Sequence, residues 1–172
     1  MIAILDSVLV SLVAFADPGF HIDLTLGEGM AGGAVGTFLT TLVVGAILVA
    51  VAPEYTQRIM AVVVDEPVES VLYGVFVLLA LLVVTIALVL TIVGILVAFP
   101  LLIVAYVVWA IGATIAYLAI ADRLIGREDG WLKPLLLAAA LNAVLVLTAI
   151  GGFVSVLVGA AGFGAVVRSW IS

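Results

Sequence analysis

Few side chains in this chain of 172 residues have the type and spacing that acid–base or metal chemistry requires. The only histidine, His21, stands two residues before Asp23, and the chain has no cysteine. One histidine beside one carboxylate is short of the ligand set that a zinc site uses. The motifs of serine hydrolases, zinc proteases, P-loops and dinucleotide-binding folds are absent from the sequence. We therefore predict no catalytic residue, no metal site, no cofactor and no enzymatic activity.

The remaining polar side chains have simpler structural explanations. Asp65, Glu66 and Glu69 surround Pro67, a residue well suited to a first helical turn. Negative charge is favoured at a helix N-terminus, so we expect a solvated patch there rather than a cation site. Asn142 is the most polar residue inside the long apolar segments. For Asn142 we expect a helix–helix hydrogen bond, worth about 0.6–2 kcal/mol in a membrane.

A long apolar run dictates the elements that must position these residues. From Val71 to Ala121 there is no charged residue and no histidine. That length is more than twice the roughly 20 residues that cross a hydrocarbon core, so the run has to cross and return as a helical hairpin. The whole chain is 67% hydrophobic and 9% charged, whereas soluble domains carry about 25% charged residues. The predicted fold class is an all-α, polytopic helical membrane protein with a single membrane domain over 1–172.

The apolar and charged segments predict the order of elements along the chain. We expect about five transmembrane helices, at 31–52, 71–90, 96–121, 135–150 and 153–167. They include two helical hairpins, a long one at 71–121 and a shorter one at 135–167. The segments between them are an N-terminal apolar helix at 1–16, an external loop at 17–30, an interfacial segment at 53–70 and a cytoplasmic loop at 122–134. Residues 1–16 either lie at the interface or form a marginal first crossing.

Glycine, threonine and proline mark the candidate hairpin turns. Thr91 to Gly94 offers a hydroxyl and a glycine, whereas Phe99-Pro100 offers a helix breaker. We favour the turn at 91–94, with Pro100 at or near the first turn of the returning helix. The second hairpin is expected to turn at Gly151 and Gly152. The order Leu-Thr-x-x-Gly occurs at 90–94 and again at 147–151, which indicates either a repeated hairpin or two uses of common turn residues.

Small residues four apart indicate where helices approach one another closely. Gly32 and Gly36 have this spacing in the first span, and Thr40 continues their face. Ala160 and Gly164 have it in the last span. We predict helix packing through Gly32, Gly36, Ala160, Gly164 and Asn142.

The basic residues predict the orientation in the membrane. With five crossings, all five fall on one side; they are Arg58, Arg123, Arg127, Lys133 and Arg168. By the positive-inside rule that side and the C-terminus are cytoplasmic, and the five side chains are also candidates for lipid head-group contacts. The net charge of −6 argues against nucleic-acid binding. Acidic loops with a single lysine are typical of a protein from a high-salt organism.

Several short motifs resemble those of a known family. They are Ala-Pro-Glu-Tyr-Thr-Gln-Arg at 52–58, Asp-Glu-Pro at 65–67, Leu-Tyr-Gly at 72–74, Thr-Ile-Val-Gly-Ile at 91–95, Pro100 and a closing Gly-Gly hairpin. Over about 31–170 the chain resembles a small haloarchaeal integral membrane family, similar to the membrane domain attached to bactofilin-like, polymer-forming cytoskeletal proteins. The resemblance implies a membrane anchor or scaffold. This chain lacks the β-helix repeat domain of the fused members, so anchoring a polymer requires a separate partner.

Two functions follow as hypotheses. The first is a non-enzymatic membrane scaffold or anchor in the cell membrane, which packs as a homo-oligomer or with a membrane or cytoskeletal protein through its small-residue helix faces. The alternative is a small channel or transporter with a site between the two hairpins near Asn142. The alternative predicts a polar-lined cavity that contains Asn142 and neighbouring threonines.

Overall fold

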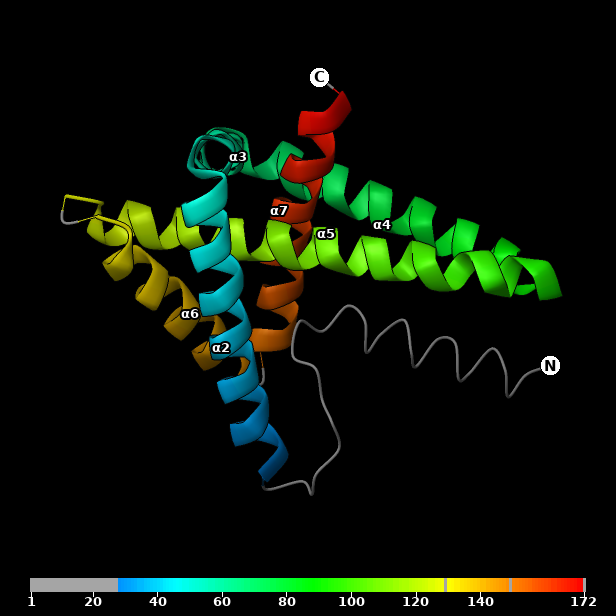
Figure 1. Ribbon diagram of the computed structural model, residues 1–172, viewed down its shortest axis with the longest axis horizontal. Helices are drawn as coiled ribbons and strands as arrows, with labels where there is room; N and C mark the ends of the chain where they lie inside the picture. Colours follow the sequence, from blue (N-terminus) through cyan, green and yellow to red (C-terminus); the bar gives the residue numbers. More distant parts are fainter. Residues whose placement is uncertain (1–27, 129, 149, 172) are drawn as a thin grey trace.

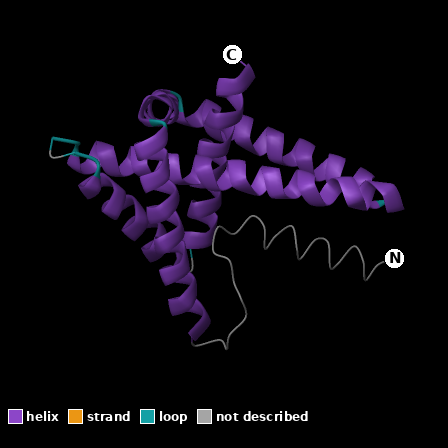
Figure 2. Ribbon diagram, viewed as in Figure 1, coloured by secondary structure: helices purple, strands orange, loops and turns teal. Residues whose placement is uncertain are grey.

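The computed structural model describes residues 28–128, 130–148 and 150–171. These residues form six helices: α2 (Glu28–Val51), α3 (Pro53–Asp65), α4 (Pro67–Val89), α5 (Ile92–Ile125), α6 (Leu132–Val146) and α7 (Gly151–Ile171). Figure 2 shows helices joined by short loops, with no strand among the described residues. The predicted all-α class is confirmed. The N-terminal helix expected at 1–16 and most of the loop expected at 17–30 lie outside the described residues.

Each of the five expected spans corresponds to one helix. Four of these helices, α2, α4, α5 and α7, are long and apolar enough to cross a membrane, and α6 is a shorter apolar helix of 15 residues. At 1.5 Å per residue, α6 covers only about 22 Å, less than the roughly 30 Å hydrocarbon core. Several long apolar helices of this kind are typical of a protein that spans a membrane.

The segment expected at the interface contains a separate short helix. Prolines stand at the first position of both α3 and α4, where a missing N–H leaves no helical bond unmade. The buried side chains of α3 recur on one face; they are Thr56, Ile59, Met60 and Val63. Its charged residues Glu54, Arg58 and Asp65 are exposed on the other face. The sequence of α3 is therefore amphipathic, and its apolar face packs against α5.

The helices form two apolar arms that diverge from a shared polar end. In Figure 1, α4 and α5 lie side by side and extend to the right, away from the rest of the molecule. The other arm contains α2 and α6, which also pack against each other. Helix α7 lies between the arms and contacts both α4 and α5. In the most apolar window of α7, 56% of the residues are buried, against 11% in α4, so α7 is the central helix.

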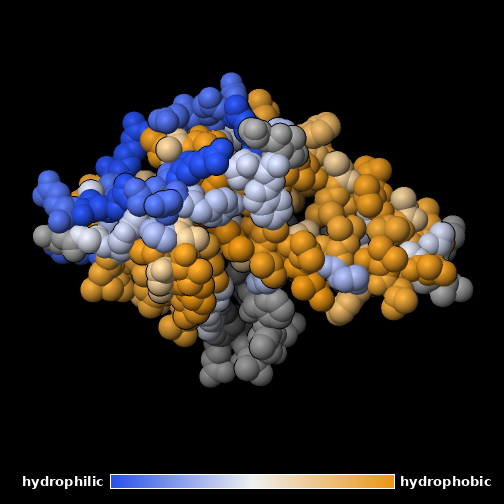
Figure 3. All heavy atoms as spheres, turned by 45° about the horizontal axis from the view of Figure 1, so that its top comes forward, coloured by the Kyte–Doolittle hydropathy of each residue, from blue (hydrophilic) through white to orange (hydrophobic). Residues whose placement is uncertain are grey.

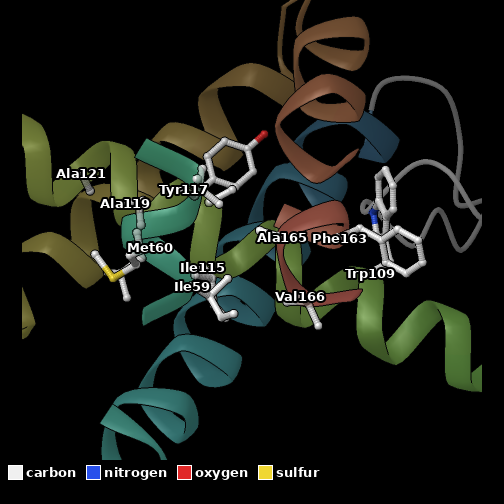
Figure 4. Close-up of a cluster of buried hydrophobic side chains, with 14 of the residues drawn as sticks. Ile59, Met60, Trp109, Ile115, Tyr117, Ala119, Ala121, Phe163, Ala165 and Val166 are labelled. Carbon is white, nitrogen blue, oxygen red and sulfur yellow. The ribbon is translucent and has the colours of Figure 1, made fainter. Parts of the chain in front are cut away.

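The core lies where α3, α5 and α7 meet, as Figure 4 shows. Ile59 of α3 and Ile115 of α5 are fully buried there. The rings of Trp109 and Phe163 lie 5.8 Å apart in a tilted arrangement, which is a favourable geometry for an aromatic pair. These contacts hold the C-terminal half of α5 against α3 and α7. The N-terminal half of α5 lies in the exposed arm, beside α4.

Hydrophilic residues gather at one end of the molecule in Figure 3. We call this end the polar end and define it as α3, residues 122–133 and residues 168–170. Below the polar end and to its right, the two arms present an orange, apolar surface. Many large apolar side chains of the α4–α5 arm are exposed, among them Phe76, Leu79 and Phe99. An exposed apolar surface of this extent suits contact with lipid chains.

The turn of the first hairpin consists of Leu90 and Thr91, because α4 ends at Val89 and α5 begins at Ile92. The turn overlaps the predicted 91–94 at Thr91 alone: Gly94, predicted as a turn residue, is the third residue of α5, and the alternative at Phe99-Pro100 lies inside that helix. Pro100, however, lies inside α5 as its ninth residue, not near its first turn. A helix in a membrane can continue through a proline when its neighbours satisfy the freed carbonyl group.

The turn of the second hairpin lies earlier than predicted. Gly151 and Gly152 are the first two residues of α7, and the chain reverses between Leu147 and Ile150. The reason is local: the amide of Gly151 donates to the carbonyl of Thr148 at 2.9 Å and closes the turn, and the amide of Val154 then donates to the carbonyl of Ile150 at 3.2 Å, so Gly151 and Gly152 already lie in the first turn of α7. Helix α7 consequently has 21 residues, more than the 15 expected at 153–167.

Candidate functional site

Glycine brings the backbones of α4 and α7 into contact. A Cβ atom on Gly74 would collide with the carbonyl oxygen of Ala160. A Cβ on Gly164 would collide with the carbonyl oxygen of Ser70 and the amide of Gly74. Small residues permit this approach, which dispersion forces then stabilise in the absence of water. Ala160 and Gly164, predicted to be packing residues, both lie in this contact.

A second glycine contact joins α5 to α7. A Cβ on Gly112 would meet the backbone of Gly162, and a Cβ on Gly162 would meet the backbone of Gly112. Three residues earlier on α7, Gly159 makes room for the indole ring of Trp109. The sequence reasoning missed Gly74, Gly112 and Gly162. For Gly74 a signal existed, since Ser70 and Gly74 repeat the small-residue spacing of four.

Gly32 and Gly36, predicted to be packing residues, contact no other described helix of this chain. Both are exposed, and a Cβ on either would have no neighbour within 4 Å. The buried stripe of α2 is displaced by one residue; it consists of Gly33, Thr37, Thr41 and Gly45. Gly45 lies against the side chains of Leu135 and Thr114, so this stripe faces α6 and α5.

Asn142 makes the helix–helix hydrogen bond that its position in α6 predicts. Its side-chain nitrogen donates to the hydroxyl of Thr41 on α2 at 2.9 Å, and both residues are buried. A small cavity of about 20 Å³ lies beside this bond, lined by threonines of α2 and by aromatic residues of α5. Thr37 Oγ1, Trp109 Nε1 and Asn142 Oδ1, all from residues that line it, have no hydrogen-bond partner among the described residues. The volume is that of about one water molecule.

The Asn142–Thr41 pair is expected to contribute measurably to folding. We expect Asn142→Leu and Thr41→Val each to lower the free energy of unfolding by about 1 kcal/mol, because each leaves the other polar group buried and unpaired. The double variant should lose less than the sum of the two. A double-mutant cycle on thermal unfolding in detergent measures the coupling, and additive losses would show that the hydrogen bond contributes nothing.

Ion pairs join the elements of the polar end. Arg168, in the last turn of α7, pairs with Glu66 and also contacts Glu69 at 3.3 Å, which ties α7 to the start of α4. Two of the three predicted acidic-patch residues thus have a cationic partner. Arg127 pairs with Asp122 at 2.8 Å, and its guanidinium group lies 4.5 Å from the ring centroid of Trp131.

The other predicted basic residues also belong to the polar end. Arg58 is exposed on α3, Arg123 is exposed in the last turn of α5, and Lys133 is the second residue of α6. All five basic residues of the chain are therefore found within or beside this end. Surface ion pairs contribute little stability singly, so their main effect here is to position the helix ends.

The two hairpin turns share one geometry. In each, the threonine hydroxyl donates to the carbonyl of a leucine three residues earlier: Thr91 to Leu88 at 3.1 Å, and Thr148 to Leu145 at 2.9 Å. A Cβ on the glycine three residues later, Gly94 or Gly151, would collide with that carbonyl and with the threonine hydroxyl. The shared sequence is longer than the motif recognised first, since 88–94 and 145–151 both read Leu-Val-Leu-Thr-x-x-Gly.

Comparisons with known proteins give a family but no activity. The model of a family described as a domain of unknown function, DUF8173, matches residues 1–172. Neither a curated protein nor a solved structure matches the chain.

Proposed function

We propose that this chain, which belongs to the DUF8173 family, whose description names no activity, is a membrane scaffold. It associates with itself or with a partner through a small-residue face. The glycine contacts that hold α4, α5 and α7 together make a compact support for such a face. Helices packed through glycine leave little room for a solute path between them.

The observation that carries the proposal is the exposed stripe on α2. Gly32, Gly36 and Thr40 stand four residues apart and are exposed. A neighbouring stripe on the same helix is buried against α5 and α6, so the exposed stripe faces outward. Inside this protein, small residues on α4, α5 and α7 meet other helices closely. The exposed stripe has the same chemistry and suits close approach by a helix of a second copy.

The proposed setting is the cell membrane, with the polar end on the cytoplasmic side. The gathering of the five basic residues supports this orientation under the positive-inside rule, and the acidic, lysine-poor composition supports a haloarchaeal origin. The resemblance to bactofilin-associated membrane domains argues for a separate cytoskeletal partner. Such a partner would bind at the polar end. The basic and acidic side chains there offer it charged contacts.

Transport is the weaker candidate function. The cavity beside Asn142 is polar-lined, as the transporter hypothesis requires, but at about 20 Å³ it has room for about one water. It also lies among α2, α5 and α6 rather than between the two hairpins as a whole. These dimensions favour a structural role for the Asn142 cluster.

Cysteine cross-linking in native membranes tests the scaffold proposal, because the chain has no cysteine of its own. We expect Thr40→Cys to form a covalent dimer on mild oxidation, and we expect Gly36→Leu in the same chain to reduce that dimer at least five-fold. The steric reason is that leucine would hold the two helices apart. Val83→Cys, which is exposed on the α4–α5 arm, is the matched control and should stay monomeric. Equal cross-linking at the two cysteines, or none at Thr40→Cys, would contradict the proposal.

A further inference from the structure

An apolar groove of about 360 Å³ lies beneath the junction of α3 and α4. Its walls come from four helices: Val64 of α3, Val71 of α4, Ala116 of α5 and Val158 of α7 are examples of its lining residues. The volume falls within the roughly 300–1,000 Å³ of pockets that bind small molecules. Because the lining is aliphatic almost throughout, the groove suits a hydrocarbon chain.

Among the described residues that line the groove, Arg123 is the only charged one. Ala116, Ala119, Ile120 and Arg123 form a stripe along α5, and at 1.5 Å per residue Arg123 stands about 10 Å beyond Ala116, toward the polar end. The groove is therefore apolar along its length and cationic where it reaches the polar end.

Among the described residues, the acidic side chains closest to Arg123 in sequence or across the polar end pair with other arginines. Glu66 and Glu69 pair with Arg168, and Asp122 pairs with Arg127. Arg123 forms no ion pair with any described residue and is exposed. Asp65 follows Val64 in the chain but does not line the groove. A guanidinium group binds a phosphate by two parallel, charge-assisted hydrogen bonds.

We propose that this groove binds a membrane phospholipid, with one of its chains between α3, α4, α5 and α7 and its phosphate on Arg123. The aliphatic walls of the groove and the position of Arg123 at its polar end match the order of chain and head group in such a lipid. The bound chain would contact α3, α4, α5 and α7 where these helices meet. This site depends on the membrane location but not on self-association through α2.

Native mass spectrometry of the full chain in detergent micelles, with phosphatidylglycerol or a diacylglycerol with the same chains added at equal concentration, tests the site. We expect the wild type to retain one phosphatidylglycerol and to bind it at least ten-fold more tightly than the diacylglycerol. Arg123→Gln should remove that preference. Val158→Phe, which places a ring in the groove, should weaken both lipids at least ten-fold.

Two matched variants keep the result interpretable. Arg127→Gln removes an arginine of the same polar end that is already paired and does not line the groove, so it should bind as the wild type does. Val154→Phe enlarges a residue one turn earlier on α7 that does not line the groove, and it should also leave binding unchanged. If Arg123→Gln and Arg127→Gln lost the preference for phosphatidylglycerol equally, the preference would come from the general surface charge. That result would overturn the proposal. Unchanged lipid binding in a folded Val158→Phe variant would also overturn it. Cross-linking through Thr40→Cys should persist in both test variants, which separates this site from the scaffold proposal.

Discussion

Replacing Gly162 with leucine is expected to destabilise the protein by about 3 kcal/mol or more. A Cβ at this position would lie against the backbone of Gly112, and that backbone belongs to a second helix that cannot move without losing its other contacts. Overpacking in a well-packed core commonly costs about 1–3 kcal/mol, and a clash between two backbones belongs at the upper end of that range or above it. The loss is measured as the free energy of unfolding in detergent, followed by circular dichroism.

Gly152→Leu provides the matched control on the same helix. Gly152 is exposed in the first turn of α7, and a Cβ there has no neighbour within 4 Å. Leucine is a better helix former than glycine by somewhat under 1 kcal/mol, so this variant should be neutral or slightly more stable. If both variants lost the same stability, the effect would come from leucine in α7 generally and not from the contact with α5.

The contrast between these two glycines shows what the sequence could and could not predict. The apolar length of each segment determines the number and type of the helices, because only a helix satisfies its own backbone in a hydrocarbon environment. That argument needs no knowledge of neighbours, and it correctly predicted the all-α class. Which face of a helix is buried depends on the partner helix, and the partner is not encoded in the local spacing.

Helix α2 illustrates the limit. Two stripes with a spacing of four residues run along it, one through Gly32, Gly36 and Thr40 and the other displaced by a single residue. Both stripes consist of small residues, so spacing alone could not distinguish the exposed stripe from the buried one. The burial of Thr41 is decided by Asn142, about a hundred residues later in the chain, which supplies its hydrogen bond. A polar residue in α6 thus selects the packing face of α2.

The turns show the opposite case, where a local motif carries most of the geometry. Leu88, Thr91 and Gly94 make contacts within seven residues, and the same contacts recur at Leu145, Thr148 and Gly151. The recurrence could be predicted because hydroxyl and glycine act over a short range. The first residue of each following helix could not be predicted, because the two turns differ in one hydrogen bond. The amide of Gly151 donates to the backbone carbonyl of Thr148, whereas the amide of Gly94 donates to the side-chain hydroxyl of Thr91.

Lysine in place of Leu79 is expected to cost about 2.5–3.5 kcal/mol when the chain folds into a bilayer. Leu79 is the residue after the midpoint of α4 and is 56% exposed on the apolar arm. If lipid chains surround the arm, a lysine at mid-depth carries the cost measured for a charge at the centre of a transmembrane helix. If water surrounded it, an exposed substitution would change stability by no more than about 0.5 kcal/mol. The measurement is the free energy of folding from urea into lipid vesicles.

Leu132→Lys is the control that separates the effect of depth in the membrane from the effect of side-chain exposure. Leu132 is 66% exposed, slightly more than Leu79, but it is the first residue of α6 and stands beside Lys133 at the polar end. A lysine there can extend its amino group into the head-group region, so its cost should stay below about 1 kcal/mol. A difference of about 2 kcal/mol or more between the two variants places the α4–α5 arm in hydrocarbon. Near-equal costs would mean that exposure in this structure does not correspond to contact with lipid, and the lipid-binding groove beside α4 would then lose its physical basis as well.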